Sequence, residues 1–581
     1  MRLTGPRLPR LPHSPRSSRS RRALLAVLSA APCAALLVAL AVPAAARAAA
    51  PLALHRTELS LPGAPAAVVP ADLDGDGDVD LAVLVAWTEW GQLSVEERQS
   101  FSGIEGLVEV LTIVPSLFDR RELRAYLNDG GGRYRLSGTP APVTTALLAL
   151  DAGPPGAPLV ALTDEGVTTW RVDPAGGSLV ATPAIATPPV LAGSGVFLPS
   201  LDFVVELSGD AWPDLMLPGE EGVDVHLGTA AGFAAVASHR LPLPGERWSP
   251  SASGPLRQYP LPQAGDLDGD RRPDLAWRHP EHGWGMPAVA RGLGEGRFAV
   301  PAPLATAATG WKPPARRPPD RGEEADAGPD PTPVVLADLD GDGRAELVSE
   351  EESPEEADGM RAELREAGSP RATLRFHRLA ADLGSVGPAY LTLPIRGHSF
   401  AEGSDVSLPG GLRDLDGDGR RDLVAMDFEL KLRRLMGAMV TQRVTVPLDF
   451  RVWCQQADGS FRPVTGLDLS GQFKVDLGRM KLRGMPSFGG DFDGDGRVDF
   501  VQLGRGRDVT IHRGGEGCRF PSKPDFVVRL RREPDHLELV RVRDLDGDGR
   551  ADLMVIHQGE ADEAGESPPV TLELHVSGGA R

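Results

Sequence analysis

The sequence contains little cysteine, few aromatic residues and fewer basic than acidic residues. Only three of its 581 residues are cysteine and 5% are aromatic, whereas Gly and Pro number 68 and 54. So few cysteines exclude a disulfide-rich scaffold. A net charge of −20 argues against partners such as nucleic acid or anionic lipid. Because 41% of the residues are hydrophobic, the chain is not expected to be disordered, and its composition indicates a turn-rich, all-β protein.

Only one hydrophobic run approaches membrane-spanning length, and it lies near the N-terminus. Residues 1–22 hold seven Arg and no acid, and the apolar run 23–42 and the small-residue stretch 43–50 follow. This order is typical of a cleaved signal peptide, with a membrane anchor as the alternative. Arg21 and Arg22 also resemble a twin-arginine export signal. We therefore expect residues 1–50 to be a signal peptide of Sec or twin-arginine type. The exported chain would then be secreted, periplasmic or on the cell surface, without a membrane span.

One acidic motif recurs along the rest of the chain. It reads DLDGDGDVDL from Asp72, and five further copies begin at Asp266, Asp338, Asp414, Asp491 and Asp544. A worn copy begins at Glu206 and a fainter one at Asp151. A short apolar run follows each acidic segment, and Gly-rich turns that end on an aromatic residue separate the later runs, as in β-hairpins. Repeats of this size indicate a ring of β-blades.

The eight repeat starts predict a single β-propeller over residues 51–581. Too few residues follow Asp544 for a whole repeat, so we expect a strand around Leu54–Leu61 to complete the last blade and close the ring. Eight blades are predicted, or seven if the Asp151 copy is not a repeat. Residues 88–121, which look partly helical, 312–333 and 350–370 are predicted to be loop insertions, and 427–441 form a basic patch of uncertain role.

The spacing of the acids suits a hard cation. Numbered from the first residue of the loop, positions 1, 3, 5 and 9 are acidic in all six good copies, and position 4 is always Gly. Alternate carboxylates around a tight turn, with a backbone carbonyl from position 7, supply the six to eight oxygens that Ca²⁺ prefers. An EF-hand is excluded, because position 12 is never acidic and strands rather than helices are predicted on both sides.

The nine-residue loop followed by an apolar strand resembles the FG-GAP/VCBS repeat of integrin α-subunit propellers and many bacterial exported proteins. The resemblance covers nearly all of residues 51–581 and implies about six structural Ca²⁺ ions. The implied ligands of the six sites, with position 7 acting through its carbonyl, are Asp72, Asp74, Asp76, Asp78 and Asp80; Asp266, Asp268, Asp270, Arg272 and Asp274; Asp338, Asp340, Asp342, Arg344 and Glu346; Asp414, Asp416, Asp418, Arg420 and Asp422; Asp491, Asp493, Asp495, Arg497 and Asp499; and Asp544, Asp546, Asp548, Arg550 and Asp552. The worn copy offers Glu206, Ser208, Asp210 and Asp214 for a weaker ion.

Nothing in the sequence forms a recognisable catalytic motif. The loop His279-Pro280-Glu281-His282 lacks the helical spacing of a zinc protease, and Trp87, Trp90 and Trp284 serve either packing or sugar stacking. Cys454 and Cys518 form a disulfide or remain two buried thiols. The sequence favours a monomeric, non-catalytic adhesion or cell-surface module with a protein or glycan ligand. Because propeller active sites leave no linear signature, an extracellular polysaccharide-active enzyme is the alternative.

Overall fold

A computed structural model describes most of the region that follows residue 51. The described residues are 52–87, 109–112, 120–153, 157–193, 197–198, 201–210, 212–243, 246–248, 256–278, 287–306, 332–352, 371–396, 411–428, 443–466, 469–476, 481–483, 487–503, 506–534, 540–557 and 570–578. The chain divides into two compact units, Met1–Ala50 and Pro51–Arg581. The predicted signal peptide, the loop 279–282, Trp90, Trp284 and most of the predicted insertions lie outside the described residues.

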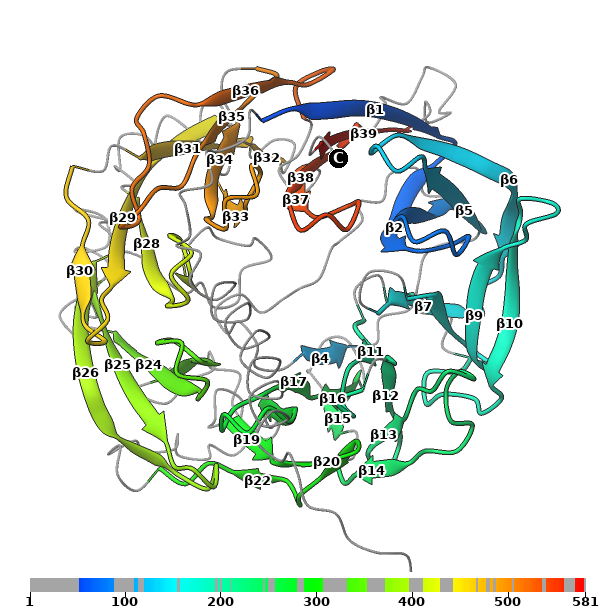
Figure 1. Cartoon of the computed structure of the whole chain (residues 1–581), viewed down its shortest axis with the longest axis horizontal. Helices are drawn as coiled ribbons and strands as arrows, with labels where there is room; N and C mark the ends of the chain where they lie inside the picture. The colour runs from blue at the N-terminus through cyan, green and yellow to red at the C-terminus, as the bar shows by residue number, and fades with distance from the viewer. Residues whose placement is uncertain are drawn as a thin grey trace, which may run out of the picture. The chain divides into compact units, whose positions relative to one another are not determined.

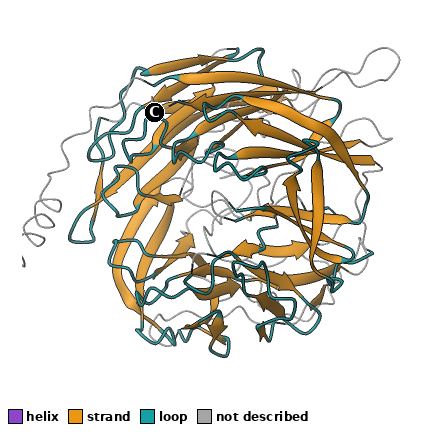
Figure 2. Ribbon diagram, turned by 45° about the vertical axis from the view of Figure 1, so that its right-hand side comes forward, coloured by secondary structure: helices purple, strands orange, loops and turns teal. Residues whose placement is uncertain are grey.

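Pro51–Arg581 is an eight-bladed β-propeller, which confirms the predicted all-β fold and the larger of the two blade numbers. Within the described ranges every regular element is a strand, and no helix there is long and apolar enough to cross a membrane. Eight antiparallel sheets follow one another around the ring in Figure 1, and the strands dominate the tilted view in Figure 2. In most blades the strands pair in the order in which they follow one another along the chain, as in the up-and-down blades of propellers, and the N-terminal β1 joins the last sheet.

The blades are numbered in chain order. Blade 1 contains β2 (Ala64–Ala71), β3 (Asp80–Trp87), β5 (Arg120–Asn128) and β6 (Tyr134–Val143); blade 2 contains β7 (Leu147–Ala152), β8 (Leu159–Thr163), β9 (Gly166–Val172) and β10 (Leu179–Ile185). Blade 3 contains β11 (Val204–Val205), β12 (Asp214–Pro218), β13 (Val223–His226) and β14 (His239–Leu241); blade 4 contains β17 (Gln263–Gly265), β18 (Asp274–Arg278), β19 (Pro287–Ala290) and β22 (Ala302–Pro303), with the hairpin β20 (Gly292–Gly294) and β21 (Arg297–Phe298).

The remaining blades follow the same plan. Blade 5 contains β23 (Thr332–Ala337), β24 (Glu346–Glu352), β25 (Arg371–Leu379) and β26 (Val386–Arg396); blade 6 contains β27 (Gly411–Arg413), β28 (Asp422–Phe428), β29 (Arg443–Gln455), β30 (Phe461–Pro463), β31 (Ser470–Asp476) and β32 (Lys481–Arg483). Blade 7 contains β33 (Ser487–Gly490), β34 (Asp499–Leu503), β35 (Asp508–His512) and β36 (Phe526–Arg529); blade 8 contains β37 (Val540–Arg543), β38 (Asp552–His557), β39 (Val570–Ser577) and the N-terminal β1 (Leu54–Leu61).

The ring closes as the sequence predicts. Strand β1 pairs antiparallel with β39, from Leu54 opposite Ser577 to Leu61 opposite Val570. The last blade is therefore built from both ends of the propeller, and pairing β1 in this way removes a free sheet edge.

The hydrophobic core lies between the blades rather than within them. In β3, Leu81, Val83 and Val85 pack toward blade 8, whereas Ala82 and Leu84 pack toward blade 2. Alternate side chains of a strand point to opposite faces, so a strand covered on both faces is apolar throughout. This packing explains the apolar runs that follow the acidic loops, such as residues 81–87 in blade 1.

Some predicted insertion boundaries are wrong by a few residues. Residues 120–121 begin β5, 332–333 begin β23 and 350–352 end β24, because the cross-strand pairing continues into each predicted loop. Within 88–121, residues 109–112 form β4 (Glu109–Thr112), not a helix. This strand pairs with β16 (Leu256–Leu261), which also pairs with β15 (Glu246–Trp248).

Candidate metal centres

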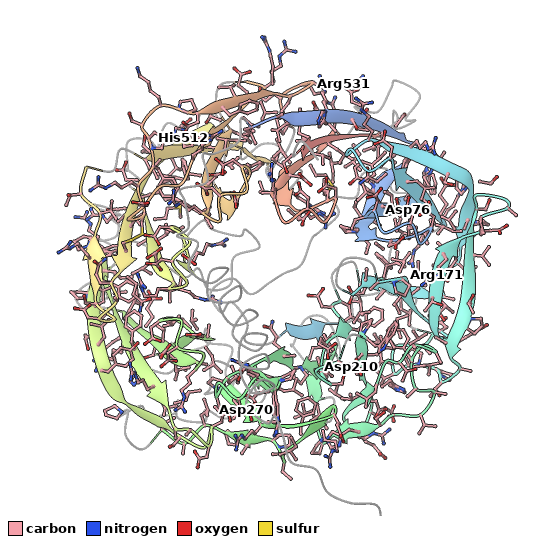
Figure 3. All side chains as sticks on the ribbon, in the orientation of Figure 1. Asp76, Arg171, Asp210, Asp270, His512 and Arg531 are labelled. Atoms are coloured by element: carbon pink, nitrogen blue, oxygen red, sulfur yellow. A yellow bond between two sulfur atoms is a disulfide. The ribbon has the colours of Figure 1, made fainter. Side chains whose placement is uncertain are left out.

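All six acidic loops connect the first strand of a blade to the second. They lie in blades 1, 4, 5, 6, 7 and 8, and the last acid of each loop is the first residue of its second strand. Figure 3 labels one loop acid in blade 1, Asp76, and one in blade 4, Asp270. The loops thus occupy the same place in every blade that carries one.

Glycine at positions 4 and 6 lets the loop turn back on itself. Both positions have positive φ, as at Gly417 (73°) and Gly419 (85°), where side chains other than glycine are strained. Arg271 at position 6 of the 266 loop adopts φ 65°, so this loop keeps the conformation at an energetic cost. In the 338 and 414 loops a Cβ atom at position 4 would also collide with the next blade. One placed on Gly341 would lie 2.7 Å from the Gly419 carbonyl oxygen, and one on Gly417 would lie 2.5 Å from the Gly496 carbonyl oxygen.

The loop N–H groups gather around the acids. In the 414 loop, Asp414 Oδ1 accepts the N–H of Gly417 at 2.8 Å and its Oδ2 accepts the N–H of Gly419 at 2.9 Å. At position 7 the Arg420 N–H donates to Asp418 Oδ1 at 2.9 Å. The two bonds to the position-1 acid recur in the 266, 338, 491 and 544 loops and orient that carboxylate before any ion binds.

The acid at position 9 is a buried clamp as well as a potential ligand. Asp422 Oδ2 accepts the N–H of Leu415 at position 2 of its own loop at 2.9 Å, and Oδ1 accepts the N–H of Gln455 on β29 at 2.8 Å. Equivalent pairs of bonds hold Asp80, Asp274, Asp499 and Asp552. The clamp fastens the acidic loop to the third strand of its blade.

The structure brings three of the predicted carboxylate ligands together in each of the 72, 266, 338 and 414 loops. Oxygens of positions 1, 3 and 9 lie within 4.8 Å of one another in the 72, 266 and 338 loops, and Asp414, Asp416 and Asp418 form a similar group. In the 414 loop, Oδ1 of Asp416 is buried without a hydrogen-bond partner. A donor set made of carboxylate oxygens, one of them buried without a partner, fits a hard divalent cation. The position-7 carbonyls stay a prediction.

Burial raises the pKa of the position-9 acids. The pKa rises to about 6 for Asp80 and to about 7 for Glu346, Asp422, Asp499 and Asp552. Backbone hydrogen bonds offset part of this rise, whereas the other loop acids add to it. Without a cation, these carboxyl groups therefore stay protonated at pH values at which an ordinary Asp or Glu side chain is already ionised.

These raised pKa values predict how the stability of the cation-free protein depends on pH. Between about pH 4 and pH 7 the folded state binds more protons than the unfolded state, so stability falls as pH rises. A bound cation favours the charged carboxylates and removes most of this loss. Urea unfolding of the cation-stripped protein at pH 5, 6 and 7 should show a falling free energy of unfolding, and saturating calcium should flatten the trend. A stripped protein that gains stability over this range would contradict the prediction.

Hydrogen bonds join the loops of neighbouring blades into a belt. The N–H at position 8 donates to a carbonyl at the start of the previous loop, as from Ala345 to Leu267 (2.9 Å) and from Arg421 to Leu339 (2.8 Å). Tyr134 of blade 1 donates its hydroxyl to the Leu545 carbonyl at 3.0 Å, which joins blade 1 to the loop of blade 8. A change in one loop therefore alters the hydrogen bonds that join it to the next blade.

A disulfide lies beside one of these loops. Cys454 and Cys518 are bonded, with Cα atoms 5.8 Å apart, which settles the alternative that their sequence left open. The bond joins β29 of blade 6 to a hairpin of blade 7, whose Gly517 N–H donates to Asp416 Oδ2 at 2.9 Å. This contact from the next blade could not be foreseen from the sequence.

The two imperfect repeats keep the blade, but the worn loop has Ser208 in place of the acid at position 3, and the loop at Asp151 keeps only its first acid. In the worn loop, labelled at Asp210 in Figure 3, Asp214 still accepts the N–H groups of Leu207, Ser208 and Gly228. Asp151 accepts the N–H groups of Phe203 and Val204 from the next blade instead. Asp214 therefore keeps the clamp of the intact loops, whereas the Asp151 repeat has Leu159 at position 9 and its acid bonds to the next blade instead.

Of the three tryptophans predicted to pack or to stack on sugars, only Trp87 lies in the described ranges. Its indole N–H donates to the Pro62 carbonyl at 3.1 Å, and the Arg120 guanidinium lies 4.5 Å from the ring centroid. Trp87 packs against the core between blades 8 and 1. This placement confirms packing as its role.

Comparison with known proteins identifies the repeat. Residues 266–349 and 491–555 match the family described as FG-GAP-like repeat. No curated protein matches the chain in sequence. Among solved structures, one described as the structural basis of specific recognition of non-reducing terminal N-acetylglucosamine by an Agrocybe aegerita lectin is 16% identical. It covers 75% of this chain and 97% of its own, with a TM-score of 0.36. A protein from Lactobacillus plantarum is 12% identical over 73% and 95% of the two chains, with a TM-score of 0.28. At these TM-scores neither likeness bears on function.

Proposed function

We propose that this propeller of FG-GAP-like repeats is exported, is stabilised by calcium in its six acidic loops, and acts as a non-catalytic binding module outside the cell. The observation that supports the calcium proposal is the set of carboxylate oxygens at positions 1, 3 and 9, or 1, 3 and 5, which lie within 4.8 Å of one another in a loop already shaped by its own N–H groups. Ca²⁺ supplies positive charge there, and the four carboxylates of each loop, with the position-7 carbonyl, hold it.

Bound calcium would stabilise the contacts between neighbouring blades. Four carboxylates in one loop repel each other until a cation neutralises them. Because each loop of blades 4 to 7 is hydrogen-bonded to the next along the belt, a loop that opens also loosens the neighbouring interface. The ion therefore contributes to the stability of the ring rather than to a reaction.

The worn loop of blade 3 offers a surface for a ligand. Trp212 takes position 7, where five intact loops carry Arg, and its side chain is 45% exposed. An exposed indole presents a flat apolar face with a polar N–H edge, a combination that is frequent in binding surfaces. We assign this surface to a glycan ligand.

A glycan array probed with the purified protein tests the assignment. Wild type should bind at least one class of glycan, and Trp212→Ala should weaken that binding about tenfold, since an aromatic anchor contributes about 1.4 kcal/mol or more. Val527→Ala, which alters an exposed apolar residue on β36 of blade 7, is the matched control and should bind as wild type. Failure of the wild type to bind any glycan, or unchanged binding by Trp212→Ala, would contradict the assignment.

A further inference from the structure

The disulfide ties blade 7 to the acidic loop of blade 6, the 414 loop. Cys454 lies near the end of β29 in blade 6, and Cys518 lies in the turn between β35 and β36 of blade 7. Both residues are buried, at 6% and 0% exposed, in one hydrophobic cluster between the two blades. The third cysteine of the sequence, Cys33, precedes the propeller, so no other acidic loop has the cysteines to form such a bond.

The turn that carries Cys518 also holds an acid of the 414 loop. The N–H of Gly517, the residue before Cys518, donates to Asp416 Oδ2 at 2.9 Å, and Cys454 Sγ lies 3.5 Å from the same oxygen. One oxygen each of Asp416 and Asp422 and both sulfur atoms lie within 4.8 Å of one another. The disulfide therefore lies against the acids at positions 3 and 9 of the loop.

Asp416 keeps one oxygen for a cation in this arrangement. While Oδ2 accepts the N–H of Gly517, Oδ1 is buried and has no hydrogen-bond partner among the described residues. An unpaired, buried carboxylate oxygen is costly, and a hard divalent cation is a partner that suits it. The contact from blade 7 thus orients a position-3 ligand before an ion arrives. A ligand that is already oriented loses less conformational freedom when the ion binds.

The disulfide holds this turn in a strained conformation. Cys518 adopts φ 57°, in the left-handed region that is unfavourable for residues other than glycine. The Arg519 N–H donates to the Gly515 carbonyl at 3.3 Å, which closes the turn on itself. The disulfide and the Gly517 N–H attach the turn to blade 6. Breaking the disulfide therefore lets the turn relax away from Asp416.

We propose that the disulfide raises the calcium affinity of the 414 loop, and that calcium bound there protects the disulfide from reduction. The inference rests on the proposed calcium binding and adds regulation at one of its sites. A dithiol reductant supplies the two electrons and two protons that convert the disulfide into the thiols of Cys454 and Cys518, and the reductant itself becomes a disulfide. The two effects are equal in size because coupling between two sites is reciprocal, and we expect a factor of about ten. The loop thus reaches its full affinity only in an oxidising compartment, where the bond forms.

Equilibration of the folded protein with mixtures of reduced and oxidised dithiothreitol, with and without calcium, tests the proposal. Alkylation of the thiols in denaturant, followed by mass spectrometry, gives the reduced fraction at each ratio. In saturating calcium, half reduction of wild type should need about a tenfold higher ratio of reduced to oxidised dithiothreitol. Asp418→Asn, which alters the exposed position-5 acid of the same loop, should lose most of this shift. Asp76→Asn, the same change in the 72 loop, is the matched control and should keep the shift.

A second readout needs no variant. Isothermal titration with calcium, with the bound ions counted by native mass spectrometry, compares oxidised and reduced wild type. Reduction should weaken one of the bound ions about tenfold and leave the others unchanged. Circular dichroism in calcium confirms that the reduced protein and both variants are folded.

The possible results separate this inference from the function on which it rests. The coupling is overturned, and calcium binding stands, if the protein binds calcium but the half-reduction ratio does not shift. The same conclusion follows if Asp418→Asn keeps the full shift, because the protection then comes from stabilisation of the whole propeller. A protein that binds no calcium at all would overturn the proposed function as well.

Discussion

Replacing Asp422 with alanine is expected to destabilise the propeller by about 3 kcal/mol or more, even without calcium. The side chain is fully buried, and it accepts hydrogen bonds from the N–H groups of Leu415 and Gln455. Each buried N–H group left without an acceptor costs about 1–3 kcal/mol. Urea unfolding of the calcium-stripped variant and wild type, at a pH where both fold, measures this loss.

Asp214→Ala separates the clamp from the cation. Asp214 makes the same kind of bonds, to the N–H groups of Leu207, Ser208 and Gly228, in a loop where Ser208 replaces the acid at position 3. Asp422→Ala and Asp214→Ala should lower the free energy of unfolding of the calcium-stripped protein by similar amounts. In calcium at about 100 times the dissociation constant, Asp422→Ala should lose roughly 2.7 kcal/mol more, because its loop no longer binds the ion. Equal losses for the two variants in calcium would mean that Asp422 is only a clamp.

Replacing Glu573 with alanine is expected to open the seam that closes the ring, at a cost of about 3–5 kcal/mol. Glu573 is fully buried on β39, where it contacts Nε2 of His557 at 2.6 Å and of His575 at 3.0 Å. Arg56 of β1 and the backbone N–H of Arg531 also bind its carboxylate, so the group ties β39 to the N-terminal strand β1 of the same blade and to the segment after β36 of blade 7. Figure 3 labels Arg531, at the top of the view.

The charge of Glu573 is part of this seam. Burial alone would raise its pKa, but hydrogen bonds from His557 and His575, and from the Arg531 N–H, hold the pKa of Glu573 well below its usual range. Glu58 on β1 is its cross-strand partner and is exposed, and it pairs with Arg531 at 2.6 Å. Glu58→Ala should therefore cost no more than about 1 kcal/mol. If urea unfolding showed that Glu573→Ala is no more destabilising than Glu58→Ala, the closure of the ring would not depend on the buried Glu573 carboxylate.

The sequence predicted the features that depend on local spacing. The acidic loops, the apolar strands after them and the closing strand Leu54–Leu61 all follow from repeat length and from residues near in sequence, and the structure agrees with each. The faint repeat at Asp151 forms a full blade because its turn residues and apolar strands are retained, although its acids are lost.

The features that the sequence did not predict depend on strand register. Arg291 and Arg513 each precede a glycine whose N–H binds the position-9 acid, and this Arg-Gly pair at the end of the third strand was a visible signal. That these arginines lie opposite position 9, beside the acidic loop, follows only from the strand register. Gly517 reaches Asp416 from the next blade, a contact that no spacing within one repeat can predict.

The central claim is that calcium in the acidic loops stabilises the propeller. A count of bound calcium, together with the melting temperature with and without calcium, tests this claim most directly. Elemental analysis of the purified protein in millimolar calcium should find about six ions per chain, one for each intact loop. Chelation with EDTA should then lower the melting temperature strongly, because each site filled at about 100 times its dissociation constant adds roughly 2.7 kcal/mol to the folded state. A protein that holds no calcium and melts at the same temperature with and without EDTA would show that the acidic loops are solvated turns, and calcium would have no part in holding the blades together.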